Sequence, residues 1–373
     1  MVKILEVKTK KDLKKWVSFP NTLYKDNPYY VPFLFSDEMA TFTKHDNPAY
    51  EFCETKLFLA YKDNKIVGRI AGLINHAYNE KWNQNAIRFT RFDFIDDYEV
   101  SEALMNEVIN WGKQNSHSTI MGPIGFTDID HEGMLVEGFD ELNMSITFYN
   151  HPYYLKHMEK LGFTKDIDWV EYQLKVPNTI DEKFEKISNR LLEHNNYSLI
   201  TYTKRKELLK DGKEAFKVID IAFSKLYGTV PLTDDVINKA IADYIPIVNL
   251  KYICSIKNKD DKIIGFAVLV PSIAKALKKS NGKLLPFGIF RLLKALNKQN
   301  DTLEMFFIAV QPEYQSKGLP AIIINHIAKV CRDNNVKYLE TGPELETNTA
   351  VQSMWKTFDA RQHKRRRCFT KEI

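Results

Sequence analysis

Runs of alternating apolar and polar residues, separated by short polar turns, recur along the whole chain. Residues 56–75 contain two such runs joined by the polar turn Asp63-Asn64-Lys65, which is typical of a β-hairpin. Residues 251–270 repeat this arrangement. Elsewhere apolar residues return every three or four positions, as over residues 320–333, and this spacing predicts helices. The pattern predicts a protein of mixed strands and helices.

The predicted elements occur twice in one order, which indicates an internal repeat. Each half has a short strand, a helix, the hairpin, a long strand, a helix, a strand that ends in Gly-Pro, a second helix and a final strand. The equivalent glycines Gly68 and Gly265 are 197 positions apart, and this interval barely changes along the repeat. With Pro177 at the join, the repeat predicts two domains, residues 1–176 and 177–373.

Composition restricts the function further. The 53 basic and 48 acidic residues leave a net charge of +5, too small to make general polyanion binding the first interpretation. The longest near-continuous apolar stretch, residues 263–274, is about half of the roughly 20 residues that a membrane span needs. The N-terminus lacks the apolar region of a signal peptide, so we expect a cytoplasmic protein. The four cysteines lie far apart, which predicts neither a disulfide framework nor a metal site.

The most specific motif, VQPEYQSKGLPA, covers residues 310–321. A strand that ends at Val310 and turns through Gly318 into a helix presents backbone N–H groups at a helix N-terminus, where a pyrophosphate can bind. This motif, with the repeated order of elements, resembles the acyl-CoA signature of the GCN5-related N-acetyltransferase (GNAT) superfamily. The resemblance covers nearly the whole chain, twice in tandem.

The resemblance implies an α/β (α+β) fold of two tandem GNAT-like domains, each a mixed, mostly antiparallel sheet flanked by helices. It also implies acetyl-CoA or another acyl-CoA as cofactor, bound by the second domain. The residues expected to bind it are Ala309, Val310, Gln315, Ser316, Lys317, Gly318, Leu319 and Ala321. Pro320 departs from the family's Gly or Ala and removes one N–H donor.

The corresponding turn of the first half carries no glycine. It has Asp96, Asp97 and Glu99 where a pyrophosphate would sit, and their negative charge opposes that of a phosphate. We therefore expect no CoA site in residues 1–176.

Catalytic residues follow from the same resemblance. Glu304 lies six residues before Val310, where some family members place a carboxylate general base. Strand alternation predicts that Glu304, Phe306, Ile308 and Val310 share one face. Tyr314 is a second candidate, as a proton donor. The simpler alternatives are an exposed strand glutamate and a tyrosine packed beneath the turn.

Two segments break the symmetry of the repeat and are candidates for substrate recognition. The loop 125–141 is acidic, and we expect it to line a substrate cleft between the halves and attract a cationic amine. The candidate substrate-binding residues are Asp128, Asp130, His131 and Glu132. A solvated surface loop is the alternative.

The second segment, residues 272–298, has seven basic side chains and no acidic one from residue 273 onward, interleaved with leucines and phenylalanines. The pattern suits an amphipathic lid that contacts an anionic membrane surface, a tRNA or CoA phosphates. A helix packed on its own domain with a solvated basic face is the favoured interpretation. A last basic run, Lys364 to Arg367, is typical of the charged face of an edge strand.

These observations predict an acyltransferase that moves an acyl group from acetyl-CoA or a related thioester to a small, cationic amine. One alternative is a transferase similar to the Fem peptidoglycan enzymes, which use aminoacyl-tRNA. Another is a non-catalytic protein of GNAT fold that binds a metabolite between its halves. The sequence identifies neither the acceptor, nor the acyl length, nor the oligomeric state.

Overall fold

The computed structural model describes residues 1–179, 182–245, 248–298, 300–355 and 358–373. The first half begins with β1 (Lys3–Glu6), α1 (Lys10–Leu23) and α2 (Phe35–Thr41). The hairpin β2 (Cys53–Lys62) and β3 (Lys65–Asn75) leads through α3 (His76–Trp82) to the long strand β4 (Ala86–Phe94). Then follow α4 (Tyr98–Gln114), β5 (Thr119–Gly122), β6 (Met134–Glu137), α5 (Tyr153–Lys160) and β7 (Thr164–Lys175).

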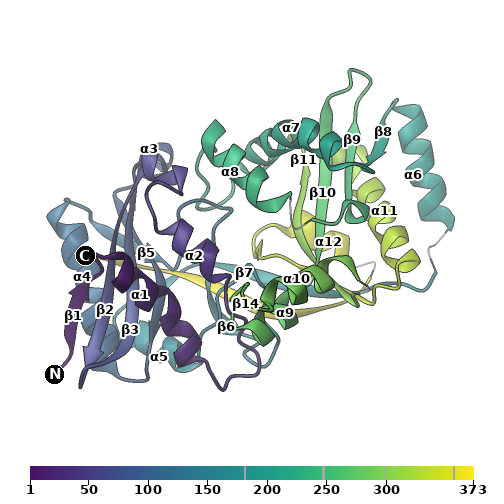
Figure 1. The fold of residues 1–373 in the computed structure, drawn as a ribbon. Coiled ribbons are helices and arrows are strands. Elements are labelled where there is room, and N and C mark those ends of the chain that lie inside the picture. Colours follow the sequence, from purple (N-terminus) through teal and green to yellow (C-terminus); the bar gives the residue numbers. More distant parts are fainter. Residues whose placement is uncertain (180–181, 246–247, 299, 356–357) are drawn as a thin grey trace.

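The second half repeats this order after an additional helix, α6 (Glu182–His194). It runs through β8 (Ser198–Thr201), α7 (Arg205–Phe223), α8 (Asp234–Tyr244) and the hairpin β9 (Ile253–Lys257) and β10 (Ile263–Pro271). Two helices, α9 (Ala274–Ser280) and α10 (Gly288–Asn297), precede the long strand β11 (Thr302–Val310). The chain ends with the 3-10 helix η3 (Pro312–Lys317), α11 (Leu319–Asp333), β12 (Tyr338–Thr341), β13 (Glu344–Leu345), α12 (Thr349–Trp355) and β14 (Asp359–Glu372). The predicted fold class, mixed α/β with tandem halves, is confirmed (Figure 1).

Short-range interactions explain where the helices form. The Thr9 hydroxyl accepts a hydrogen bond from the Asp12 N–H at 3.1 Å and caps α1. Asp97 caps α4 in the same way through the Glu99 N–H, also at 3.1 Å. The buried face of α4 then packs on β3 at Gly68, where a Cβ atom would approach Leu104 Cδ1 to 2.7 Å. Glycine is required there because the helix lies so close to the strand.

One continuous sheet joins the halves, in the order β1-β2-β3-β4-β5-β14-β7-β12-β11-β10-β9-β8. All neighbours in this order pair antiparallel except β4 with β5 and β11 with β12, which are parallel. The final strand of each half pairs with the other half. β7 pairs with β12, and β14 returns to pair with β5 as well as with β7 (Figure 1).

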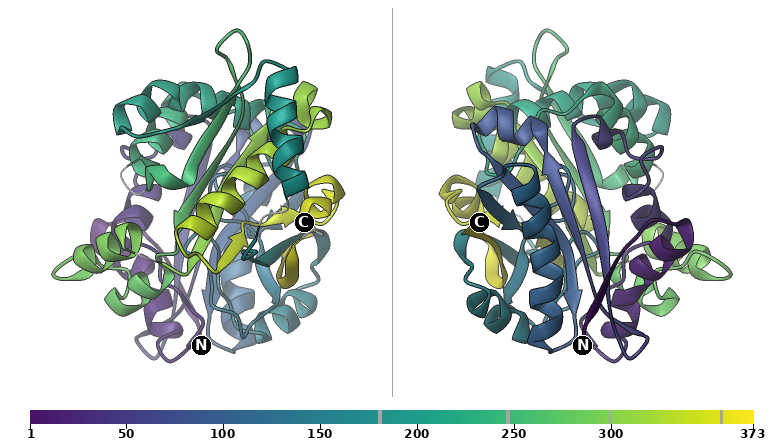
Figure 2. Two further views of the ribbon diagram at one scale, coloured as in Figure 1. Left: turned by 90° about the vertical axis from the view of Figure 1, so that its right-hand side faces the viewer. Right: turned by 90° about the vertical axis from the view of Figure 1, so that its left-hand side faces the viewer.

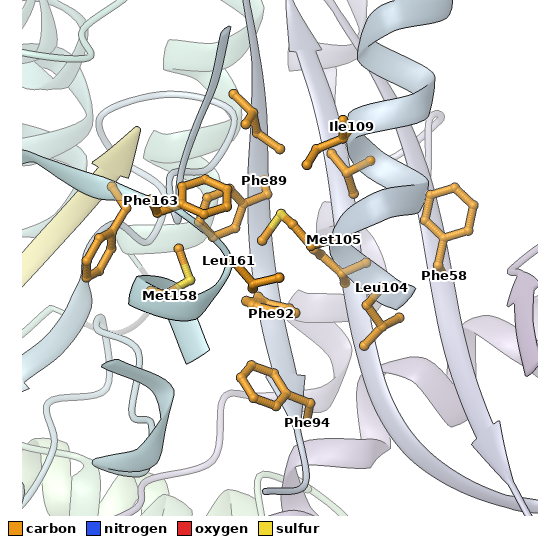
Figure 3. Close-up of a cluster of buried hydrophobic side chains, with 14 of the residues drawn as sticks. Phe58, Phe89, Phe92, Phe94, Leu104, Met105, Ile109, Met158, Leu161 and Phe163 are labelled. Carbon is orange, nitrogen blue, oxygen red and sulfur yellow. The ribbon is translucent and has the colours of Figure 1, made fainter. Parts of the chain in front are cut away.

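The cores confirm that the last strands are exchanged. Phe369 of β14 packs in the core of the first half, whereas Leu174 of β7 packs in the core of the second. Figure 3 shows the first of these cores, in which Phe89, Phe92 and Phe94 of β4 meet side chains from α4 and the end of α5. Neither half therefore completes its own sheet or its own core.

β14 is an internal strand, because it lies between β5 and β7. The prediction that the basic run Lys364 to Arg367 marks an edge strand is therefore wrong. Lys364 and Arg366 are buried, whereas Arg365 and Arg367 point to the other face and pair with the Asp168 carboxylate. In the described residues, no helix is long and apolar enough to cross a bilayer.

We predict that Phe369→Ala lowers the free energy of unfolding by about 3 kcal/mol or more, because it empties a buried aromatic position in the core of the first half. Urea unfolding followed by far-ultraviolet circular dichroism measures the change. Leu209→Ala, at an exposed position of α7, is the matched control and should change stability by less than about 0.5 kcal/mol. Equal stability of the two variants would contradict the strand exchange.

Candidate active site

The strands β11 and β12 diverge at the centre of the second half. They pair only from Thr302 to Met305 of β11, opposite Tyr338 to Thr341 of β12. β12 ends there, whereas β11 continues to Val310 along β10. The open side of β11 includes Phe306, Phe307 and Ile308, which are half-exposed. Ala309 and Val310, the expected contacts of a thioester carbonyl, are buried at the end of this unpaired stretch.

The turn after β11 forms η3 and reaches α11 through Gly318, whose φ of 81° is in the left-handed region. Gln315 donates its side-chain N–H to the Val310 carbonyl at 3.1 Å and closes the turn. Ser316 and Lys317 are exposed beside it. Side chains that can hold an anionic group are therefore present at the turn.

The backbone of this turn offers fewer donors than the motif implies. Pro320 has no N–H, the Ala321 N–H already donates to the Gly318 carbonyl at 3.1 Å, and Leu319 is fully buried. A Cβ atom at Gly318 would lie 2.6 Å from Leu191 Cδ1 of α6. The glycine thus makes room for helix α6, and the residues that fit a phosphate group at this turn are chiefly Lys317 and the polar side chains before it.

Glu304 lies one residue before the strands diverge and is only 1% exposed. Its carboxylate accepts hydrogen bonds from the hydroxyls of Ser272, at 2.6 Å, and Ser145, at 3.1 Å. Burial raises the pKa of Glu304 to about 7; the hydrogen bond from Ser272 opposes the shift, and the nearby carboxylate of Glu340 adds to it. The two serines belong to the loop before α5 and to the start of the 272–298 segment, so parts of both halves meet at this carboxylate.

A β-bulge changes the face on which Glu304 lies. The register of β10 against β11 shifts so that Glu304 faces Val270, Phe307 faces Val268, and Phe306 has no partner on β10. The alternation is therefore interrupted at Phe306. Glu304 shares its face with Phe307 and Ala309, whereas Ile308 and Val310 lie on the opposite face, so the expectation of one common face is wrong.

Glu304 belongs to a row of charges across β11, β12, β7 and β14, all of them buried except the partly exposed Glu340. We call this row the junction cluster; it comprises Glu304, Glu340, Glu171, Lys364 and Arg366. Lys364 Nζ lies 3.5 Å from Glu171 and 3.7 Å from Glu340. Arg366 pairs with Glu171 and also donates to Asn143 and Thr147 at 2.9 Å. Three carboxylates face two cations, so a proton on Glu304 balances the cluster.

The sequence predicts Glu304 but not the rest of this cluster. Ser145, Ser272, Glu171 and Lys364 carry no motif, and they come together only because β7 and β14 are exchanged. The basic run at residues 364–367 could have indicated this cluster, since charged side chains of an internal strand need buried partners of opposite charge.

The predicted acidic loop lies beside the junction cluster. Phe148 connects the two, because its carbonyl accepts from Arg366 and its ring lies 5.4 Å from that of His131. Asp130, however, receives two hydrogen bonds from Arg91, at 2.7 and 3.0 Å. Burial alone would raise the pKa of Asp130, but the Arg91 guanidinium holds it well below its usual range. The charge of Asp130 is thus compensated within the protein.

The neighbours of Asp130 are also held internally. His131 bonds to Asp130 and packs on the Phe33 ring at 4.1 Å. Burial raises the pKa of Asp128 to about 6 and that of Glu132 well above its usual value. These partly buried residues are therefore held by contacts within the protein beside the site and do not form a fully solvated loop.

Tyr314 lies on the other side of the sheet from Glu304. Its ring packs 6.1 Å from that of Tyr197 in the cluster beneath α11, and Lys317 Nζ lies 4.7 Å from its centroid. In the first half, Asp97 caps α4 and pairs with Lys62 at 2.6 Å, so the carboxylate occupies the helix N-terminus that a phosphate would need.

Comparisons with known proteins agree with this architecture. Residues 232–359 match the model of the Acetyltransferase (GNAT) family. The chain is 28% identical to Protein YghO of Escherichia coli, with 98% of this chain and 94% of the relative covered. It is 22% identical to a bacterial ceramide synthase of Caulobacter vibrioides, with 99% and 97% covered. A solved tandem GNAT protein from the clavulanic acid biosynthesis pathway superposes with a TM-score of 0.56 at 10% identity, covering 100% of this chain and 98% of that one.

We predict that Asp130→Asn lowers the free energy of unfolding by about 3 kcal/mol, because it removes one of the two carboxylates that compensate the buried Arg91. Thermal and urea unfolding measure the loss. Asp140→Asn, in the exposed part of the same loop, is the control and should leave stability unchanged. A stable Asp130→Asn protein would contradict the structural role assigned to this carboxylate.

Proposed function

Because the chain has the tandem form of the GNAT fold, we propose that it is an acyltransferase that moves an acyl group from an acyl-CoA to an amine in its second half. The observation that carries this proposal is the environment of Glu304. It is a buried carboxyl with a pKa raised to about 7, one residue before the divergence of β11 and β12. A group with this pKa can accept a proton near neutral pH and release it again.

Transfer requires the amine to lose its proton before its nitrogen attacks the acyl carbon. The ionised Glu304 carboxylate accepts that proton, while the hydroxyls of Ser272 and Ser145 hold the carboxylate in place. An acyl-CoA would supply the activated thioester. The neutral nitrogen attacks, the C–N bond forms and the C–S bond breaks, and the second proton that the nitrogen loses goes to the departing thiolate, so that the products are the amide and the CoA thiol. Protonated Glu304 then passes its proton to solvent, which its pKa of about 7 allows near neutral pH, and the carboxylate is restored for the next amine.

Another buried titratable group, His363 of β14, is a weaker candidate for this role. Burial lowers the pKa of His363 to about 4, so its neutral imidazole attracts protons poorly at neutral pH. Glu304 is therefore the better general base. Tyr314, on the α11 side of the sheet, remains a candidate donor of a proton to the leaving thiolate.

The donor would approach from the α11 side of the sheet and the amine from the side of Glu304. The unpaired edge of β11 from Phe306 to Val310 separates these two sides. Ala309 and Val310 remain the expected neighbours of the acyl carbonyl. Gln315, Ser316 and Lys317 are the proposed contacts of the CoA phosphates, and Lys317 supplies the positive charge. Gly318, Leu319 and Ala321 shape the turn behind them.

An amine acceptor agrees with two observations. With Glu304 ionised, the junction cluster has one negative charge more than it has positive charges, which favours a positively charged substrate. One relative is named a ceramide synthase, and ceramides are N-acyl amides.

A metabolite-binding protein without catalysis is the second candidate. It is favoured by Leu191, which fills the space beside Gly318, and by the missing donor at Pro320. Failure to bind any acyl-CoA, with retained binding of an amine, would select it.

We predict that Glu304→Gln lowers kcat about 100-fold or more, because the amide cannot accept the proton. The acidic limb of the wild-type pH–rate profile should have a midpoint near pH 7. Protein stability gives a second readout. The folded state binds this proton more tightly than the unfolded state, so wild-type stability should fall as pH rises from about 4.5 to about 7. The fall should be smaller in Glu304→Gln, in which Asp128 and Glu132 still contribute to it. Full activity of Glu304→Gln would contradict the assignment.

We predict that Lys317→Glu weakens acyl-CoA binding about tenfold without changing stability, because it reverses an exposed charge at the proposed phosphate contact. Calorimetric titration with acetyl-CoA and with a long-chain acyl-CoA measures the affinity. Lys213→Glu on α7 is the matched control. Gly318→Trp would be a poorer test, because the positive φ and the contact with Leu191 would disturb folding. Equal affinities of the two charge variants would place the phosphates elsewhere.

A further inference from the structure

The segment between β10 and β11 has two apolar faces, and the protein covers only one of them. We call residues 273–298 the α9–α10 hairpin. Its inner residues Leu277, Leu292 and Leu296 pack with Val31 of the first half and Val270 of β10. This packing agrees with the predicted helix on its own domain, but it accounts for only part of the apolar residues.

Four large apolar side chains of the hairpin remain uncovered. Leu285 is 79% exposed, Phe287 63%, Phe290 67% and Leu293 47%. They lie within nine consecutive residues, whereas the other exposed large apolar side chains of the described chain are scattered over six separate sites. Such a concentration of exposed apolar surface is typical of an interaction site. We call these four residues the apolar tip.

The hairpin projects from the side of the molecule, next to the helices of the first half (Figure 2). The first half holds it there: the Lys278 ammonium donates to the carbonyls of Asn27, at 2.7 Å, and Tyr30, at 3.1 Å. The Phe35 N–H donates to the Gly282 carbonyl at 2.9 Å. The apolar tip is therefore preformed and points away from the body of the protein.

Basic side chains surround the apolar tip. Lys279, Lys283, Arg291, Lys294 and Lys298 are exposed, and residues 273–298 contain no acidic side chain. The Arg291 guanidinium donates to the Lys279 carbonyl at 3.1 Å, which joins the two helices. Apolar side chains that can enter the acyl region, beside cations that can remain at the headgroups, are what an interfacial helix presents to a bilayer.

We propose that the α9–α10 hairpin docks on the surface of an anionic lipid membrane. The aliphatic Leu285 and Leu293 favour a bilayer over a single-stranded nucleic acid, which would need stacking side chains in place of leucines. A second copy of the chain would leave the surrounding cations facing one another, since both copies would bring the same charges. The exposed basic side chains of the hairpin and the apolar tip together thus match an anionic bilayer.

Docking also narrows the acceptor, and this part rests on the proposed function. The hairpin begins directly after Ser272, whose hydroxyl contacts Glu304. Only a short segment of chain thus separates a membrane-bound hairpin from Ser272, the residue that contacts the proposed base. The acceptor amine would then be a lipid that resides in the bilayer.

Vesicle flotation tests the docking without any acyl donor. The full-length protein is mixed with vesicles of phosphatidylcholine alone or of phosphatidylcholine with phosphatidylglycerol. We expect binding to the anionic vesicles, reduced more than about tenfold by Phe287→Gln/Phe290→Gln. Lys283→Gln/Lys294→Gln should reduce binding to anionic vesicles about tenfold. Leu209→Gln/Ile221→Gln, at similarly exposed apolar positions of α7, is the matched control and should bind as the wild type does.

Several results would overturn the docking. One is that the wild type binds neither vesicle. Another is that the Phe287→Gln/Phe290→Gln and control variants bind equally. A third is that the wild type is a dimer that dissociates only in Phe287→Gln/Phe290→Gln. Binding of a single-stranded RNA in place of vesicles would also overturn it. Turnover separates docking from catalysis: the double phenylalanine variant should lose activity on a vesicle-embedded amine and keep it on a water-soluble amine. No turnover of either amine by the wild type, with vesicle binding intact, would refute the proposed function and leave the docking standing.

Discussion

The insertion of β14 between β5 and β7 is the constraint on which the rest of the structure depends. Its first residues pair with the end of β7, and its last residues pair with β5 of the first half. Two GNAT-like halves thereby share one sheet, and each depends on a strand of the other for its core. Because of the exchange, the division along the chain differs from the division in space: residues 164–175 end the first half along the chain, but Leu174 among them packs in the core of the second half.

The same insertion creates the polar interior of the site. β7 and β14 bring Glu171, Lys364 and Arg366 next to Glu304 and Glu340, where no single half could assemble them. Buried charges are costly unless they are paired, and here the pairing leaves one carboxylate in excess. That excess, with burial, keeps a proton on Glu304 up to about pH 7. In the proposed reaction the first half binds no donor, yet its loop supplies Ser145 and its helices hold the α9–α10 hairpin.

Periodicity and the internal repeat predicted the order of elements, the two hairpins and the tandem fold, because these depend on local patterns that the chain repeats. Glu304 was also found, since its spacing from Val310 matches a motif. The face of the strand on which Glu304 lies was not predicted correctly. The unpaired residue Phe306 reverses the alternation, and no sequence pattern indicates this. Asp130 looked free to bind a cation because its partner Arg91 lies 39 residues away in sequence. The exchange of the final strands was also missed. A final strand buries the same residues whether it pairs within its own half or with the other half.

The protonation state of Glu304 is the quantity that tests this account most directly. Infrared spectra of the wild type minus those of Glu304→Gln isolate the C=O band of this one protonated carboxyl, and a pH series gives its midpoint. The account predicts a midpoint near pH 7, well above the ordinary value of 4.5. A band that disappears near pH 4.5 would mean that Glu304 is ionised at neutral pH like a surface carboxylate, and both the junction cluster and the proposed base would have to be abandoned.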